Sequence, residues 1–78
     1  MPHVVIKMIK GPSVKQQEEA AKKIRDVLEE TMGKPGKYVS VSVEEYSFNE
    51  WEGVYDACIK DNKNVVLKPG YTNPVTFS

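Results

Sequence analysis

The residue of this sequence with the most distinctive chemistry is the proline at position 2. A small residue after the initiator methionine commonly permits removal of Met1, which would expose the Pro2 nitrogen as a secondary amine. An α-amino group has a reference pKa of about 7.7–8.0, and a proline amine starts somewhat more basic. Apolar neighbours would lower that pKa because they disfavour the charged form. The neutral amine can accept a proton near pH 7, which makes Pro2 a candidate general base unless its place at the terminus is incidental.

The other candidates for catalysis or metal binding are few. The one histidine, His3, has no partner that the spacing suggests for a catalytic triad. The one cysteine, Cys58, falls on an apolar helical stripe, where burial is favoured over a nucleophilic role. Glu44 and Glu45 are neighbours on an expected strand and therefore point to opposite faces. Because the glycines form no phosphate-binding loop and one His with one Cys cannot build a zinc site, the sequence predicts neither metal nor cofactor.

The length of the chain restricts how it can be stabilised. Its 78 residues form a single domain, 1–78, in which residues from about 72 to 78 are expected to be a tail. A domain of this size buries a small fraction of its surface, and such scaffolds usually need a disulfide, a metal or a partner subunit. Because one cysteine cannot form an intrachain disulfide, we expect a homo-oligomer.

The charge and hydropathy of the chain argue against two classes of partner. Eleven basic and eleven acidic residues give a net charge of zero, which disfavours nucleic-acid binding. No apolar run approaches the roughly 20 residues of a membrane span, and the N-terminus lacks the charged and apolar regions of a signal peptide. We therefore expect a cytoplasmic protein with neither a nucleic-acid nor a membrane partner.

Two predicted strands flank a helix. Residues 4–9 form an apolar, largely β-branched run broken by Lys7, which predicts a strand that begins almost at Pro2 and stops before Gly11. Residues 38–44 alternate strictly between apolar and polar, which predicts a second strand with one face of each kind. A strand, a helix and a strand imply parallel pairing. The predicted fold class is α+β: one βαβ unit with parallel strands, a short second helix and a C-terminal extension, completed by oligomerisation.

Two capping boxes mark the expected helix starts. Ser13 and Ser47 each stand three residues before a Gln or Glu, as the capping box requires. After Ser13, apolar residues at helical spacing predict an amphipathic helix over residues 14–32, which Gly33 ends. The second box opens a shorter helix that includes Trp51. For residues 65–67 the sequence leaves open a brief strand or a turn of helix.

The order of these features resembles the 4-oxalocrotonate tautomerase family over roughly residues 2–55. The features that carry the resemblance are the Met1-Pro2 start running straight into a strand up to Met8, the Gly11-x-Ser13 turn, Gln16-Gln17 opening a long helix with Ile24 and Val27-Leu28, the Val39-x-Val41-x-Val43-x-Glu45 strand, and Trp51. The segments around Trp51–Ile59 and Leu67–Tyr71 look like the longer, PptA-like subgroup, whose members form dimers whereas shorter members form hexamers.

The resemblance implies a cofactor-independent tautomerase that interconverts the enol and keto forms of a 2-oxo acid. Pro2 would be the general base, and Trp51 would be an aromatic wall of the substrate pocket. The implied partners are a small 2-oxo acid or enol substrate and further copies of the chain, as a dimer in preference to a hexamer.

One departure from the family concerns the oxyanion. Pro12 and Ser40 stand where the best-studied members carry arginines that hold the carboxylate and polarise the carbonyl. Backbone N–H groups, the Ser40 hydroxyl, Lys7 or Lys10 would have to take over this role. A phenylpyruvate-like enol therefore fits the pocket better than a dicarboxylate.

Two other classes of function stay open on the sequence. The same scaffold could serve as a binding or structural protein that lost catalysis together with the arginines. A small module that pairs with another protein through its sheet edge is the third possibility.

Overall fold

The computed structural model describes residues 1–72, which form a βαβ unit followed by a second helix and an irregular segment. In chain order the elements are β1 (His3–Ile9), α1 (Val14–Met32), the 3₁₀ turn η1 (Gly36–Tyr38), β2 (Ser40–Tyr46), α2 (Phe48–Val54) and the π-helical turn η2 (Tyr55–Ile59). This order confirms the predicted α+β fold with two strands, a short second helix and a C-terminal extension.

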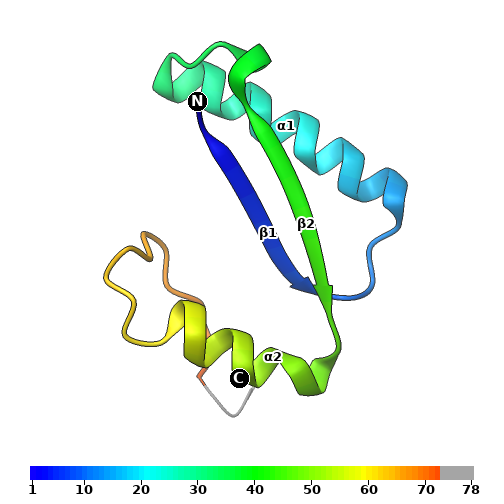
Figure 1. Cartoon of the computed structure of the whole chain (residues 1–78), viewed down its shortest axis with the longest axis vertical. Coiled ribbons are helices and arrows are strands. Elements are labelled where there is room, and N and C mark those ends of the chain that lie inside the picture. Colours follow the sequence, from blue (N-terminus) through cyan, green and yellow to red (C-terminus); the bar gives the residue numbers. More distant parts are fainter. Residues whose placement is uncertain (73–78) are drawn as a thin grey trace.

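The two strands pair in parallel, as predicted, with His3 opposite Ser40 at one end and Ile9 opposite Tyr46 at the other. Successive side chains alternate between the two faces of the pair. One face packs against α1, whose Gln17 side chain donates a 2.6 Å hydrogen bond to a carboxylate oxygen of Glu45. Figure 1 shows α1 along one side of the strands and α2 across the end at which both strands finish. The other face, called the open face below, begins with His3 and Ser40.

The first helix has the bounds that the sequence predicts. The Ser13 hydroxyl accepts a hydrogen bond from the Gln16 N–H, and the Gln16 side chain accepts one from the Ser13 N–H. At the other end, Gly33 has a left-handed backbone with φ 64°, and its N–H donates to the Glu29 carbonyl. Because residues close in the sequence make every one of these contacts, local chemistry is sufficient to fix both ends.

The second strand lies two residues later than the alternation of residues 38–44 predicts. Residues 36–38 form η1 instead, in which the Tyr38 N–H donates to the Pro35 carbonyl at 3.0 Å. The Val39 N–H donates to the Gly36 carbonyl at 3.1 Å. The helical backbone of residues 36–38 is incompatible with an extended strand, so pairing begins at Ser40.

The chain after β2 confirms one prediction and resolves an alternative. A capping box between Ser47 and Glu50 opens α2, and the apolar stripe beyond it stays helical through η2. Cys58 on this stripe is half-buried. Residues 65–67 form neither a strand nor a helix. The predicted tail falls outside the described residues, apart from Thr72.

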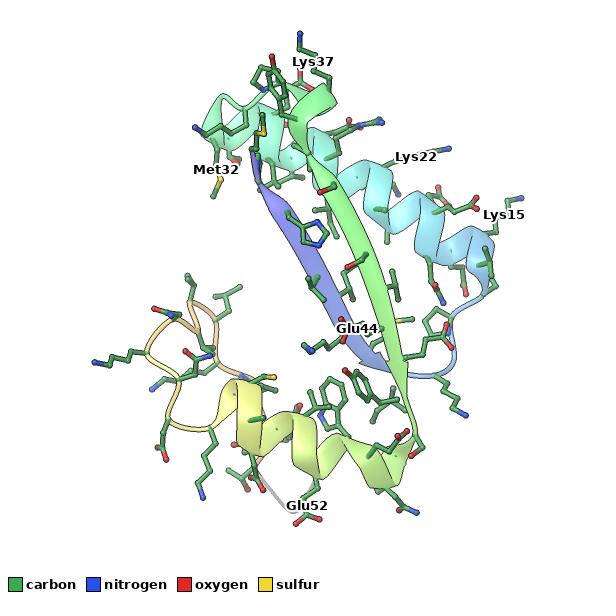
Figure 2. The ribbon with its side chains drawn as sticks, viewed as in Figure 1. Lys15, Lys22, Met32, Lys37, Glu44 and Glu52 are labelled. Carbon is green, nitrogen blue, oxygen red and sulfur yellow. The ribbon has the colours of Figure 1, made fainter. Side chains whose placement is uncertain are left out.

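A single copy of the chain buries little. Within residues 1–72, Val54 is the one buried apolar residue, with 9% of its surface exposed. Large apolar side chains remain exposed on β1, both α-helices, η1 and the segments outside these elements: Met1, Val5, Val14, Val27, Met32, Tyr38, Phe48, Val66 and Leu67. Figure 2 shows the Met32 side chain projecting from the end of α1, away from the strands. None of the helices in the described part of the chain is long and apolar enough to span a membrane.

Candidate functional site

The N-terminal ends of the two strands bring Pro2 and Ser40 together. Pro2 is half-buried at the entrance to β1, and its carbonyl accepts a 3.2 Å hydrogen bond from the Ser40 N–H. This bond is part of the parallel pairing of His3 with Ser40, since in a parallel ladder each strand bonds to the residues that flank its partner. Two of the three predicted site residues are therefore neighbours, although 38 positions separate them in the sequence.

The side chain of Ser40 has a partner that the sequence does not reveal. The Nδ1 atom of His3 lies 2.7 Å from the Ser40 hydroxyl oxygen, a hydrogen-bond distance. A histidine nitrogen and a serine hydroxyl can each donate or accept, so either His3 or Ser40 can be the donor of this hydrogen bond. Spacing alone suggested no partner for His3. The signal that would have found one is the parallel register, because the residue after Pro2 falls opposite the first residue of β2.

Trp51, the third predicted site residue, lies at the opposite end of the strands. Its ring meets the Tyr46 ring edge to face, with centroids 6.2 Å apart, and Tyr46 is the last residue of β2. From Ser40 to Tyr46 the strand advances six residues, or roughly 20 Å at about 3.3 Å per residue. One chain therefore does not place Trp51 beside Pro2.

The C-terminal extension, residues 60–72 of the described chain, holds Trp51 in place. The indole N–H of Trp51 donates a part-buried hydrogen bond of 2.8 Å to the hydroxyl of Tyr71. The ring of Tyr71 in turn lies against that of Tyr55, with centroids 5.6 Å apart and planes 44° apart. Burial of an indole N–H requires such an acceptor, so the orientation of Trp51 depends on residues 20 positions away.

We expect Tyr71→Phe to change the environment of Trp51. The substitution removes the acceptor of a part-buried N–H and should lower the free energy of unfolding by about 0.5–1.5 kcal/mol. Trp51 is the single tryptophan, so its fluorescence emission reports this contact without background. Tyr38→Phe, at an exposed tyrosine of η1, is the matched control. Identical emission and stability in the two variants would contradict the role of Tyr71.

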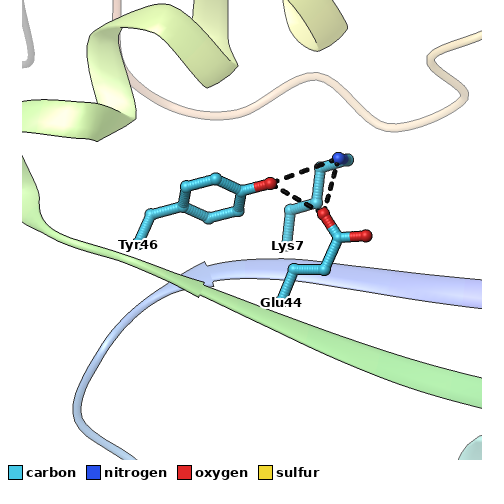
Figure 3. Close-up of polar contacts among 3 residues, drawn as sticks. All are labelled: Lys7, Glu44 and Tyr46. Carbon is cyan, nitrogen blue, oxygen red and sulfur yellow. Dashed lines mark hydrogen bonds and ion pairs between the residues drawn. The ribbon is translucent and has the colours of Figure 1, made fainter.

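Lys7, a candidate for oxyanion stabilisation, is bound to other side chains on the open face. Its Nζ atom lies 2.9 Å from Glu44 Oε1 and donates at 3.4 Å to the hydroxyl of Tyr46, which itself donates to Glu44 at 2.7 Å (Figure 3). The hydrogen bond to Glu44 raises the pKa of Lys7, and the bond from Lys7 lowers the pKa of Glu44. The bond to Glu44 also raises the pKa of Tyr46.

Neither lysine proposed for the oxyanion is near Pro2. Lys7 is five residues along β1 from Pro2, and its charge is paired with Glu44. Lys10 follows β1, where its N–H donates to the Tyr46 carbonyl at 2.9 Å, at the far end of the strand pair. Of the polar side chains suggested by the sequence, Ser40 is therefore the one that the fold places beside Pro2.

Comparison with known proteins identifies the family. The family model described as tautomerase enzyme matches residues 2–62. A probable tautomerase of Xylella fastidiosa is 32% identical over 73 residues, covering 91% of this chain and 89% of the relative. A probable tautomerase of Bacillus cereus is 35% identical over 51 residues, covering 65% of this chain and 84% of the relative.

A solved structure agrees with these matches. The crystal structure of YwhB, a homologue of 4-oxalocrotonate tautomerase, has a TM-score of 0.56 and 28% sequence identity, over 59% of this chain and 75% of that one. The region that matches the family model contains both strands and both helices, together with Pro2, Ser40 and Trp51. The chain belongs to the tautomerase family.

Proposed function

We propose that this protein is a keto–enol tautomerase for 2-oxo acids such as phenylpyruvate, with the amine of Pro2 as its general base. The observation that carries the proposal is the contact between Pro2 and Ser40 at the start of the two strands, with His3 bound to the Ser40 hydroxyl. Membership of the tautomerase family supports the reaction class. The substrate and the base are our inference from the residues at this end of the strands.

The reaction needs one proton to leave an oxygen and another to reach a carbon. After Met1 is removed, the neutral Pro2 amine takes the proton of the enol hydroxyl and returns a proton to the neighbouring carbon, which yields the 2-oxo acid. Negative charge builds on the substrate oxygen during this transfer. The Ser40 hydroxyl is a donor for that oxygen, and His3 fixes the orientation of the hydroxyl.

The aromatic wall of this site requires a second copy of the chain. Trp51 lies roughly 20 Å from Pro2 along the strands, too far to contact the same substrate. We propose a homodimer in which Trp51 of one copy lies close to Pro2 and Ser40, at the N-terminal ends of the two strands, in the other copy. The exposed apolar side chains and the scarcity of buried residues in one chain support association.

The proposal is tested by following the conversion of phenylpyruvate enol to the keto form by ultraviolet absorbance. The sample is protein whose mass confirms the absence of Met1, measured beside Pro2→Ala. We expect conversion well above the uncatalysed rate and a steep fall in the variant. Absence of conversion, or equal rates in the two proteins, would reject the Pro2 mechanism for this substrate and favour a non-enzymatic binding scaffold.

Loss of the Ser40 hydroxyl should slow the reaction. We expect Ser40→Ala to lower kcat/KM by about a hundredfold to a thousandfold, because removal of one preorganised donor weakens the stabilisation of the oxyanion. Ser42 is the matched control, since it lies two residues further along the same face of β2. Ser42→Ala should keep the activity of the unmodified protein. A similar small effect of both substitutions would rule out Ser40 as the donor.

A further inference from the structure

The C-terminal extension surrounds a cavity that the tautomerase proposal does not use. It has a volume of about 620 Å³ and lies between η2 and the irregular segment that follows, up to Thr72. This volume is within the range of roughly 300–1,000 Å³ for small-molecule sites. Figure 1 shows the segment after α2 running out as a loop and returning toward that helix. Most of this loop lies beyond residue 62, where the match to the family model ends.

One part of the cavity wall is aromatic and aliphatic. Tyr55 and Tyr71 contribute half-buried rings whose planes meet at 44°. Ile59, Val65 and Pro69 continue this surface and are also half-buried. Such a wall can accept a flat apolar group of the size of a phenyl ring.

The other part of the wall is positively charged. Lys60, Lys63 and Lys68 line the cavity, and Asp61 is the one acidic residue among its lining residues. Each of these lysines is exposed, and none takes part in a salt bridge with another described residue. The chain as a whole has no net charge, so three lysines around one cavity, with no ion pair to a residue in 1–72, form a local concentration of positive charge.

We propose that this cavity binds an aromatic monocarboxylate, with the ring of the ligand against Tyr55 and Tyr71 and its carboxylate among the three lysines. The ligand class follows from the combination of a flat apolar surface and three lysine side chains in one cavity. Binding of such an acid in the cavity does not depend on the proposed function. The further statement that the acid is also the substrate rests on the proposed function. Tyr71 links the cavity to the proposed substrate wall, because its hydroxyl accepts the hydrogen bond of the Trp51 indole.

Nuclear magnetic resonance of the full ¹⁵N-labelled chain tests the proposal. The probe is 3-phenylpropionate, which has the ring and the carboxylate but cannot tautomerise. We expect saturable shifts of the Ile59 and Val65 amide signals and of the single indole signal, which belongs to Trp51. Propionate and inorganic phosphate should bind at least about tenfold more weakly, because each lacks the ring. Phosphate binding as tight as that of phenylpropionate would overturn the assignment to an aromatic acid.

The lysines are tested with a charge-matched pair of variants. We expect K60Q/K63Q/K68Q to bind phenylpropionate about tenfold more weakly, since each exposed lysine makes a modest, solvent-screened contribution to binding the carboxylate. The control K15Q/K22Q/K34Q removes the same charge at exposed positions outside the cavity and should bind like the unmodified chain. Figure 2 shows Lys15 and Lys22 on α1, with side chains pointing away from the strands. If the triple variant fails to fold, Lys68→Gln alone is measured instead, and a smaller loss of affinity for phenylpropionate is expected.

Several outcomes separate this site from the tautomerase proposal. Absence of saturable shifts, or equal affinity in the lysine variants and the control, would overturn the cavity assignment. Saturable, lysine-dependent binding by protein that fails to convert phenylpyruvate would support the cavity and reject the proposed function alone. Binding should also weaken as salt is raised, because the lysines are exposed to solvent.

Discussion

Protein that begins at Pro2 is expected to convert phenylpyruvate at least about a hundredfold faster than protein with a residue joined to the Pro2 nitrogen. The reason is that a preceding residue turns the amine into an amide, whose nitrogen lone pair is delocalised and cannot accept a proton. General-base catalysis typically contributes about 10²–10⁴-fold to the rate, so the loss should be in this range. The measurement is the ultraviolet assay on samples whose N-terminus is identified by mass.

The matched variant carries one glycine inserted between Met1 and Pro2. It keeps the proline ring, and the carbonyl that accepts from the Ser40 N–H stays in place, so β1 retains its register. Unchanged thermal unfolding of the variant would show that the fold is intact. Equal rates with and without the glycine would exclude the N-terminal amine as the base, whatever the effect of Pro2→Ala.

The parts of the fold that depend on local contacts were predictable from the sequence. The bounds of α1 follow from a capping box at Ser13 and a left-handed Gly33, both of which involve residues within four positions. The start of β2 was predicted two residues early, at residue 38 instead of Ser40. Strict alternation favours a strand at those positions, but it does not show that residues 36–38 form a 3₁₀ turn instead.

The site depends on contacts between distant residues, which limits what the sequence alone can predict. The sequence marks Pro2 and Ser40 as candidate site residues, and only the parallel register shows that they are neighbours. The same register supplies the His3–Ser40 bond, which spacing along the chain does not reveal. Trp51 is held by Tyr46 and Tyr71, so its distance from Pro2 could not be obtained from the helical pattern around it.

The stability of the protein should depend strongly on its concentration. Within the described residues only Val54 is buried, and the two-stranded sheet leaves both of its outer edges unpaired. For a dimer that unfolds to separate chains, tenfold dilution lowers the apparent free energy of unfolding by about 1.4 kcal/mol. With a urea dependence of about 1 kcal/mol per molar, the midpoint of unfolding should fall by about 1.4 M. A midpoint that does not change over a hundredfold dilution would contradict association.

Val5 offers a way to locate the surface that associates. It lies in the middle of β1 on the open face, is 42% exposed, and has α1 on the opposite side of the sheet. In an associated state that covers this face, Val5→Asp would bury a carboxylate without a partner, so we expect the variant to sediment as a monomer. Val14→Asp is the matched control, because Val14 is 69% exposed in the first turn of α1, where a negative charge is favourable. If both variants sediment as the unmodified protein does, association must use a different surface, and the exposed Val66 and Leu67 become the next positions to substitute.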